Sequence, residues 1–468
     1  SGGNNTAIGK NALTALTSGT DNSSLGSGSL AATTTGSGNV GLGRNALLLN
    51  ETGNYNVAIG QNSMDAHTAG DQNTAVGFAT LSANTTAGYN TAVGDSALKL
   101  NTTGSSNVAV GSGALDANTT AANNTAVGAA ALGANTTGTE LVALGSSALA
   151  ANTTADANTA VGMQSLTSNT TGAHNTALGR IALQANTTAS YNTAIGSRSL
   201  LSNTTAERNT ALGYNSLAAN TTGSNNCAVG KDALAANTEG HNNIGIGVDA
   251  LTVNTTGSNN IAIGRQSLDS NTTGAQNVAI GKEALTANTT GTDNIAIGLE
   301  TLDANTTADY NIALGRAALG VNTTGAYNLA IGSFALDANT TASNNTAVGY
   351  SALSDNTTGH TNTAVGKTAL GDNTTANGGT AVGLDALRKN TTGGFNTAVG
   401  AYSLDACTTG QWNTAVGYDA LTRATTGEKN TAVGKAALDA CTTGSNNTAL
   451  GREALNSVTT GEVNVAIS

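Results

Sequence analysis

Glycine recurs every 17 residues along this chain, at 27 positions from Gly9 and Gly26 to Gly451, without an insertion or a deletion. A period of 17 residues is too short for a pair of helices, so each repeat must be one coil that buries its apolar face by stacking on its neighbours. The spacing therefore predicts an all-β fold, a parallel β-solenoid with 17 residues per coil and about 27 coils. We expect one continuous solenoid domain over residues 1–468.

The composition limits the partners that such a chain can have. Only 3% of the residues are aromatic, 10% are charged and none is proline, which predicts a narrow core and a backbone whose N–H groups are used in ladders between coils. The net charge of −11 argues against nucleic acid as a partner. No apolar run approaches the roughly 20 residues that cross a bilayer, so we expect no membrane insertion of this segment. The chain starts without Met and ends inside a repeat, so we expect a piece of a longer or processed fibre.

The copies of the repeat show which positions tolerate change; positions are counted here from the repeated glycine. Position −1 is Val, Ile or Leu in all 27 copies, and position +4 is Leu in 26, with Met64 as the exception. Position −3 is Thr in 15 copies and mostly aliphatic in the others. We predict that these three columns point inward, which makes the segment N-T-A-V-G a strand with alternating faces.

Position −2 lies between two of these columns and would then point out of the coil. It is Ala in 24 of 27 copies, although positions +1, +2 and +5 vary freely. Another chain packed closely along this column is the simplest reason for excluding larger side chains, and the alternative is that alanine only suits a tight outer sheet. We therefore predict an oligomer interface along the alanine column, represented by Ala92, Ala126, Ala160, Ala177, Ala194 and Ala228.

Other columns predict structural roles. The repeated glycine has no substitute, which indicates a positive φ or a backbone too close for a Cβ atom. The NTTG corner ends in Gly in 19 copies and in Ala in 8, so positive φ is not expected there. Asn at +7 in 20 copies and at −4 in 25 predicts buried amide ladders that satisfy the backbone of the turns. Cys227, Cys407 and Cys441 are too few for a disulfide scaffold and are expected to be buried thiols.

Aromatic residues fall in variable columns, and seven of them are at position −5. Aromatic side chains on an outer face can stack on sugars or fill a pocket of a partner. The alternative is scattered surface aromatics that cover neighbouring coils. Pairs on adjacent coils are the candidate contacts for a receptor or glycan, namely Tyr310 with Tyr327 and Phe395 with Trp412.

The sequence predicts no catalytic residues, no metal site and no cofactor. The histidines His67, His174, His241 and His360 are spread over most of the chain and cannot share a metal. No Cys/His pair, serine elbow, phosphate-binding loop or calcium-binding nonapeptide is present. A solenoid enzyme should show a clustered break in the repeat, and hexapeptide-repeat acyltransferases need 18 residues per coil. We therefore do not expect an enzyme.

The strand unit N-T-A-V-G and its variants N-V-A-I-G and N-I-A-I-G resemble repeats in the heads of trimeric autotransporter adhesins of the YadA type. That resemblance implies left-handed parallel β-rolls from three chains, packed around a common axis through small residues. The longer form A-L-x-x-N-T-T-G is also similar to repeats in bacterial and phage proteins described as tail-fibre-like. The coil is longer than the usual adhesin head repeat, and neither a neck, stalk, membrane anchor nor chaperone domain is present in these 468 residues.

Three functions remain open from the sequence. The first is a structural and adhesive extracellular fibre, a homotrimeric rod on a cell surface or virion that presents sites to a receptor or glycan. The second is the shaft of a phage tail fibre for host recognition, which the same resemblance implies. The third is ice binding by threonine ladders, but the consecutive threonines of NTT should point to opposite faces, whereas a two-column array needs T-x-T spacing.

Overall fold

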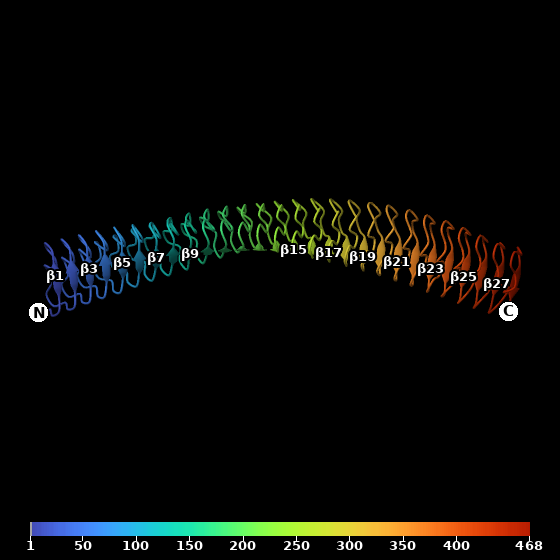
Figure 1. Cartoon of the computed structure of the whole chain (residues 1–468), viewed down its shortest axis with the longest axis horizontal. Helices are drawn as coiled ribbons and strands as arrows, with labels where there is room; N and C mark the ends of the chain where they lie inside the picture. The colour runs from blue at the N-terminus through green and yellow to red at the C-terminus, as the bar shows by residue number, and fades with distance from the viewer. Residues whose placement is uncertain (1) are drawn as a thin grey trace. The chain divides into compact units, whose positions relative to one another are not determined.

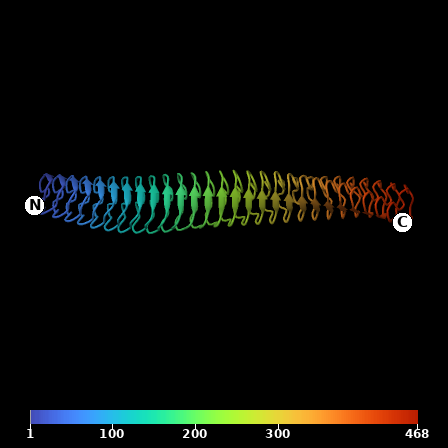
Figure 2. The ribbon, with the colours of Figure 1, turned by 90° about the horizontal axis from the view of Figure 1, so that it is seen from below.

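The computed structural model describes residues 2–468 and has the predicted fold, an all-β parallel β-solenoid with 17 residues per coil and about 27 coils. The chain divides into two compact units, Ser1–Glu239 and Gly240–Ser468. In each unit the coils stack one behind the next, and every coil contributes one three-residue strand (Figure 1). The strands of each unit lie in one row on the same side of the stack (Figure 2).

Each unit contains 14 of the 28 strands. The strands of the first unit are β1 Thr6–Ile8, β2 Ser23–Leu25, β3 Val40–Leu42, β4 Val57–Ile59, β5 Thr74–Val76, β6 Thr91–Val93, β7 Val108–Val110, β8 Thr125–Val127, β9 Val142–Leu144, β10 Thr159–Val161, β11 Thr176–Leu178, β12 Thr193–Ile195, β13 Thr210–Leu212 and β14 Cys227–Val229. Those of the second unit are β15 Ile244–Ile246, β16 Ile261–Ile263, β17 Val278–Ile280, β18 Ile295–Ile297, β19 Ile312–Leu314, β20 Leu329–Ile331, β21 Thr346–Val348, β22 Thr363–Val365, β23 Thr380–Val382, β24 Thr397–Val399, β25 Thr414–Val416, β26 Thr431–Val433, β27 Thr448–Leu450 and β28 Val465–Ile467.

Neighbouring strands pair in parallel with an offset of one repeat, so each repeat position forms a column along the stack. Ala92 of β6, for example, pairs with Ala109 of β7. Backbone bonds continue past the strand ends, as from the Gly111 N–H to the Val93 carbonyl at 2.7 Å. The ladders between coils therefore use the backbone donors that the absence of proline leaves available.

The structure reverses the predicted direction of the strand side chains. The alternation is correct, but the alanine column points into the coil, where Ala92, Ala126, Ala160, Ala177, Ala194 and Ala228 are each 0% exposed. The columns at −1 and −3, predicted to be core, face outward; Val93 is 36% and Leu178 45% exposed. The prediction that these alanines form an oligomer interface is therefore wrong, because their side chains lie inside the coil.

The interior has no room for a larger side chain beneath the strand. At Gly41, which occupies the alanine position of β3, an added Cβ atom would lie 2.5 Å from Ser29 Oγ and 3.2 Å from Leu30 Cγ. The residues at +3 and +4 thus fill the space opposite the strand. Only Ala, Ser and Gly occur at this position, because close-packed interiors do not absorb added volume freely.

The leucine column at +4 is buried as predicted, and Met64 takes the same place with 0% exposure. The backbone conformation of this column was not predicted. The leucines have φ near +50°, as at Leu98 (φ 51°), and positive φ also occurs at +2 and +12. Left-handed conformations are uncommon for residues other than glycine, so tight stacking holds the backbone against a local preference.

The repeated glycine meets both conditions that its invariance indicated. These glycines have φ between 120° and 146°, and a Cβ atom on Gly94 would lie 2.6 Å from the Gly111 carbonyl oxygen. At the NTTG corner, Gly104 has no positive φ, as predicted. The first corner therefore admits only glycine, whereas the second also occurs with alanine.

Both predicted asparagine ladders are confirmed, and their side chains are fully buried. In the +7 column, Asn118 Nδ2 donates to Asn101 Oδ1 of the preceding coil at 2.8 Å and to the Ala121 carbonyl of its own coil at 3.1 Å. In the −4 column, the Asn107 backbone N–H donates to Asn90 Oδ1 at 3.0 Å. These chains of amides satisfy the corner carbonyls without water.

The +7 ladder has faults where another residue replaces asparagine. Among residues 2–468, the buried Oδ1 atoms of Asn50 and Asn390 have no hydrogen-bond partner. The next coil carries His67 in the first case and Cys407 in the second. A missing donor in one coil thus leaves the acceptor of the preceding coil unpaired.

Candidate functional site

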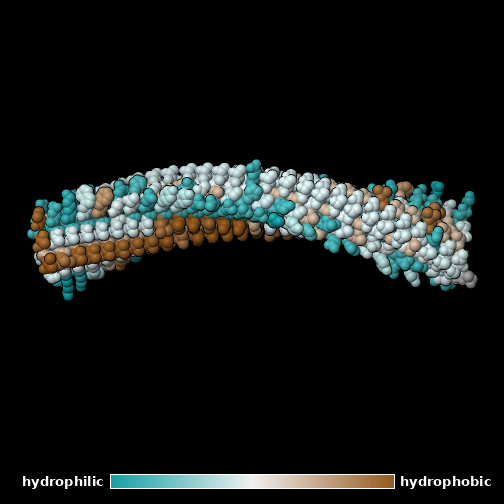
Figure 3. Space-filling model, turned by 180° about the vertical axis from the view of Figure 1, so that it is seen from behind, coloured by the Kyte–Doolittle hydropathy of each residue, from teal (hydrophilic) through white to brown (hydrophobic). Residues whose placement is uncertain are grey.

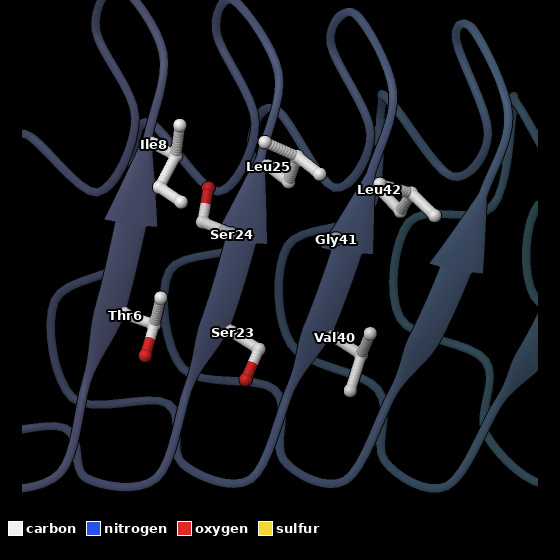
Figure 4. A pocket seen from close by; sticks show the side chains of 8 residues that line it. All are labelled: Thr6, Ile8, Ser23, Ser24, Leu25, Val40, Gly41 and Leu42. Atoms are coloured by element: carbon white, nitrogen blue, oxygen red, sulfur yellow. The ribbon is translucent and has the colours of Figure 1, made fainter.

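The outer side of the strands is the most distinctive surface of each unit. We call the side chains at positions −3 and −1 the sheet face. In β1–β3 they form two rows on one side of the ribbon, Thr6, Ser23 and Val40 in one and Ile8, Leu25 and Leu42 in the other (Figure 4). The small residues between the rows leave a shallow groove of about 240 Å³. No position of either column carries a charged residue in any of the 28 strands.

In the second unit, six consecutive strands make the sheet face aliphatic in both columns. We call this set the aliphatic block of β15–β20; it consists of Ile244, Ile246, Ile261, Ile263, Val278, Ile280, Ile295, Ile297, Ile312, Leu314, Leu329 and Ile331. Ile297 and Ile312 are each 37% exposed. From β21 to β27 the −3 column is threonine again. Figure 3 shows a brown band along this face of the second unit, with a pale band beside it where threonine replaces the aliphatic residues.

The two predicted aromatic pairs are formed. Tyr310 and Tyr327 stack with ring centroids 5.0 Å apart and planes 12° from parallel, and Phe395 and Trp412 stack at 6.2 Å and 5°. All four side chains are exposed, by 49% to 59%. Lys429 Nζ lies 5.6 Å from the centroid of the Trp412 ring, which is cation–π distance. The pairs are five coils apart, so they form two separate clusters.

The structure adds aromatic contacts that the sequence reasoning missed. His174 stacks on Tyr191 at 5.1 Å, and the Arg208 guanidinium lies 5.9 Å from the centroid of the same tyrosine. Their common position in successive coils was the signal that could have revealed them. On the other side of the strands, Tyr402 and Tyr418 meet edge to face at 6.0 Å. The coils around β25 therefore carry aromatic clusters before and after the strand.

His67 is a structural residue within the asparagine ladder. It is fully buried; its Nε2–H donates to the Gly70 carbonyl at 2.7 Å, and its Nδ1 accepts from Asn84 Nδ2 at 2.9 Å. Burial lowers the pKa of His67 below its usual value, while its bond to Gly70 and the nearby Asp71 oppose that shift. The neutral ring thus reproduces two of the three bonds that an asparagine makes at this position.

The cysteines do not form a reactive site. Cys407 and Cys441 are fully buried, as predicted, and burial raises the pKa of the Cys407 thiol to about 12. Cys227 was expected to be buried too, but it lies half-buried in the −3 column of the sheet face. All three are free thiols.

Some of the charged side chains form ion pairs at the surface. Lys231 Nζ lies 2.7 Å from Asp232 Oδ2, and Arg388 Nε lies 3.1 Å from Asp405 Oδ1 of the following coil. Such pairs contribute little to stability. Within residues 2–468, no group of three His, Cys, Asp or Glu side chains is placed to hold a metal ion. In the same part of the chain, no helix has the length and apolar character to cross a membrane.

Comparisons with known proteins give no family assignment. No protein-family model matches the chain, and no curated protein matches its sequence.

Proposed function

We propose that this chain is a segment of a structural and adhesive extracellular fibre in which several copies associate side by side through the sheet face. The observation that carries the proposal is an uncharged face, aliphatic at −1 in every coil, on the outside of each stack. With strands about 4.8 Å apart and about 10 Å wide, the 14 strands of one unit give a flat face of roughly 670 Å². Threonine at −3 occupies part of this area, so the apolar part is comparable with the largest apolar patches of typical monomers, roughly 300–600 Å², which are often functional.

A second copy of the chain is the partner that fits this face best. Its side chains recur once per coil, and another stack of the same coils has the same axial spacing over the same length. Identical subunits normally associate by closed symmetry. The resemblance to trimeric adhesin heads favours three copies, now packed through the aliphatic columns rather than through alanine.

The adhesive part of the proposal concerns the aromatic clusters, above all Phe395 and Trp412 with Lys429. Phe395 and Lys429 belong to the coils before and after Trp412, so they occupy the two sides of its ring. A glycan or receptor would then meet exposed ring edges and an ammonium group rather than a bare ring face. The Tyr310–Tyr327 pair offers a second surface of stacked, exposed rings.

Light scattering tests the association directly. We expect a mass that is a multiple of the 45.5 kDa chain, three times that mass for a trimer. The variant Ile297→Lys puts a charge on the sheet face and should lower the mass to that of one chain. The matched variant Val321→Lys changes a side chain that is 47% exposed but lies away from this face, and should not. A monomeric wild-type chain, or equal effects of the two variants, would refute the interface.

Ice binding remains a second candidate, because the structure provides an array that the NTT threonines do not. In β21–β27, threonine at −3 and valine or leucine at −1 both face outward, at T-x-V spacing. The first NTT threonine is half-buried instead, and the Thr102 hydroxyl donates to the Thr119 carbonyl at 3.0 Å. A thermal-hysteresis assay separates the two functions, since a face covered by other copies cannot bind ice. The tail-fibre alternative shares the proposed assembly and differs in whether the fibre is found on a cell or on a virion.

A further inference from the structure

We infer that the aliphatic block of β15–β20 fixes the axial register and the polarity of the assembly, so that copies lie parallel with the same coil at the same level. This inference rests on the proposed association through the sheet face. It concerns which coils meet, not whether the copies meet.

Repeats make register a problem for any such assembly. The −1 column is aliphatic in every coil, so sliding one copy by one coil replaces each contact with an equivalent one, except at the ends. Interfaces with weakly specified register are prone to slippage. A unique arrangement therefore needs a feature of the face that does not repeat from coil to coil.

The −3 column of the second unit supplies such a feature. Its first six strands, β15–β20, carry Ile, Val or Leu at this position, and the next seven, β21–β27, carry Thr. With parallel copies in register, the block meets the block and threonine meets threonine. A slip of each further coil places one more aliphatic side chain of the block against a threonine hydroxyl at the β20–β21 end of the block. Burying a hydroxyl without a partner is unfavourable.

The position of the block also selects polarity. It occupies the first six of the 14 strands in this unit. If two second units were antiparallel and fully overlapped, the block would face the last six strands, of which five carry threonine at −3. When the two units overlap fully, only the parallel arrangement brings the block against itself over its whole length.

The first unit has a weaker pattern of the same kind. Its −3 column is aliphatic only in β3, β4, β7 and β9, at Val40, Val57, Val108 and Val142. These strands are irregularly spaced, so no shift by whole coils superimposes all four. The same reasoning therefore favours the same register in this unit, with fewer residues.

Disulfide cross-linking measures the register. In full-length chains with Cys227→Ser, the remaining cysteines are buried and unreactive, and Thr346→Cys places a thiol in the −3 column just after the block. In a same-level pair, the thiol of Thr346→Cys forms a disulfide with the same thiol, or with that of Val348→Cys, in another copy. One-coil offset pairs join it to Thr363→Cys or Val365→Cys in co-expressed chains. A disulfide requires Cα atoms within roughly 7 Å, so a shift of one coil changes which pair forms.

With the native block, we expect the better same-level pair to cross-link at least tenfold faster than either offset pair. We call the block erased when all six of its −3 residues are replaced, by Ile244→Thr, Ile261→Thr, Val278→Thr, Ile295→Thr, Ile312→Thr and Leu329→Thr. The erased block should reduce this preference to a few-fold while light scattering shows unchanged mass, because only the weaker pattern of the first unit then remains. A control with three Ile→Val changes in the −1 column, at 246, 280 and 297, should keep the native preference.

Three results would overturn the inference. If the erased block keeps the tenfold preference, the block does not set the register. If the erased chain dissociates, the block supplies affinity rather than register. If the native-block chain is itself monomeric by light scattering, the proposed association fails, and the inference fails with it.

Discussion

The variant His67→Asn should restore the hydrogen bond that the +7 ladder lacks at Asn50. At present Asn50 Oδ1 is buried without a donor, because the imidazole directs its N–H to Gly70 and its other nitrogen to Asn84. In the intact ladder, an asparagine donates both to the preceding Oδ1 and to its own corner carbonyl, as Asn118 does. The variant His67→Asn therefore adds one hydrogen bond and preserves the other two.

The expected gain follows from the buried acceptor. Leaving a buried polar group unpaired costs about 1–3 kcal/mol, so the repair should stabilise these coils by about that amount. Because tenfold in an equilibrium constant corresponds to about 1.4 kcal/mol, amide exchange in the affected coils should slow by roughly 5- to 150-fold. In a stack, stability is close to a sum over neighbouring coils, so the effect should be local to residues around 50–84.

The same variant should remove an acid sensitivity. The pKa of His67 is lower in the folded state than in the unfolded chain, so its contribution to stability is complete above the ordinary histidine pKa of 6.5. That contribution is lost as the pH falls from 6.5 through the folded pKa. Protonated Nδ1 would face the Asn84 amide, and Asn84 could turn its oxygen toward the ring only by giving up its 3.1 Å bond to the Ala87 carbonyl.

Hydrogen exchange followed by mass spectrometry at pH 7.5 and pH 5 measures both effects. Wild type should lose protection in this segment at pH 5, relative to intrinsic exchange at that pH, and His67→Asn should not. The control His174→Asn changes an exposed histidine and should leave the segment as in wild type. If His67→Asn fails to slow exchange at pH 7.5, or keeps the acid sensitivity, the account of the ladder is wrong.

Three further experiments test the backbone conformation and the second fault of the +7 ladder. Ala130 has φ 54° and Ala129 has no positive φ, while both are exposed, so Ala130→Gly should be more stable than Ala129→Gly by about 1–2 kcal/mol in thermal or denaturant unfolding. Cys407→Asn should supply the donor that Asn390 Oδ1 lacks and slow local amide exchange, whereas unchanged exchange would argue against the unpaired acceptor. Gly213→Ala should cost at least about 1–3 kcal/mol, because φ is 140° and the new Cβ would lie 2.4 Å from the Gly230 carbonyl oxygen; wild-type stability in unfolding measurements would contradict this.

Features in which the same residue type recurs at one position in nearly all copies could be predicted, because such recurrence has a single physical cause. They are the period, the leucine column, the glycine corner and both asparagine ladders. The sequence indicates the left-handed backbone at positions +2 and +12 only weakly, through the glycines Gly28, Gly113 and Gly38 at these positions. Nothing in the sequence predicted positive φ at the leucines. That conformation depends on how the whole coil closes, not on the local residue.

The direction of the strand faces could not be obtained from alternation alone. Alternation separates two faces, and the larger apolar residues were assigned to the interior. The exceptions in the alanine column indicate the direction better. Ser24, Gly41 and Gly245 are all small, as a filled interior requires. Thr in 15 copies of the −3 column fits a surface better than a dry core.

The corrected direction moves the argument for assembly from one column to another and strengthens it. Alanine is now explained within the coil, since residues such as Leu30 leave space only for small side chains beneath the strand. The aliphatic residue at −1 has no such internal cause: it faces outward, yet it is Val, Ile or Leu in all 27 copies, while the neighbouring position +1 accepts Lys, Asp, Tyr and Ala. Position −1 thus faces outward and never becomes polar, whereas positions +1, +2 and +5 vary freely, which indicates a constraint from outside the coil. The proposed contact with other copies along the sheet face would provide that constraint.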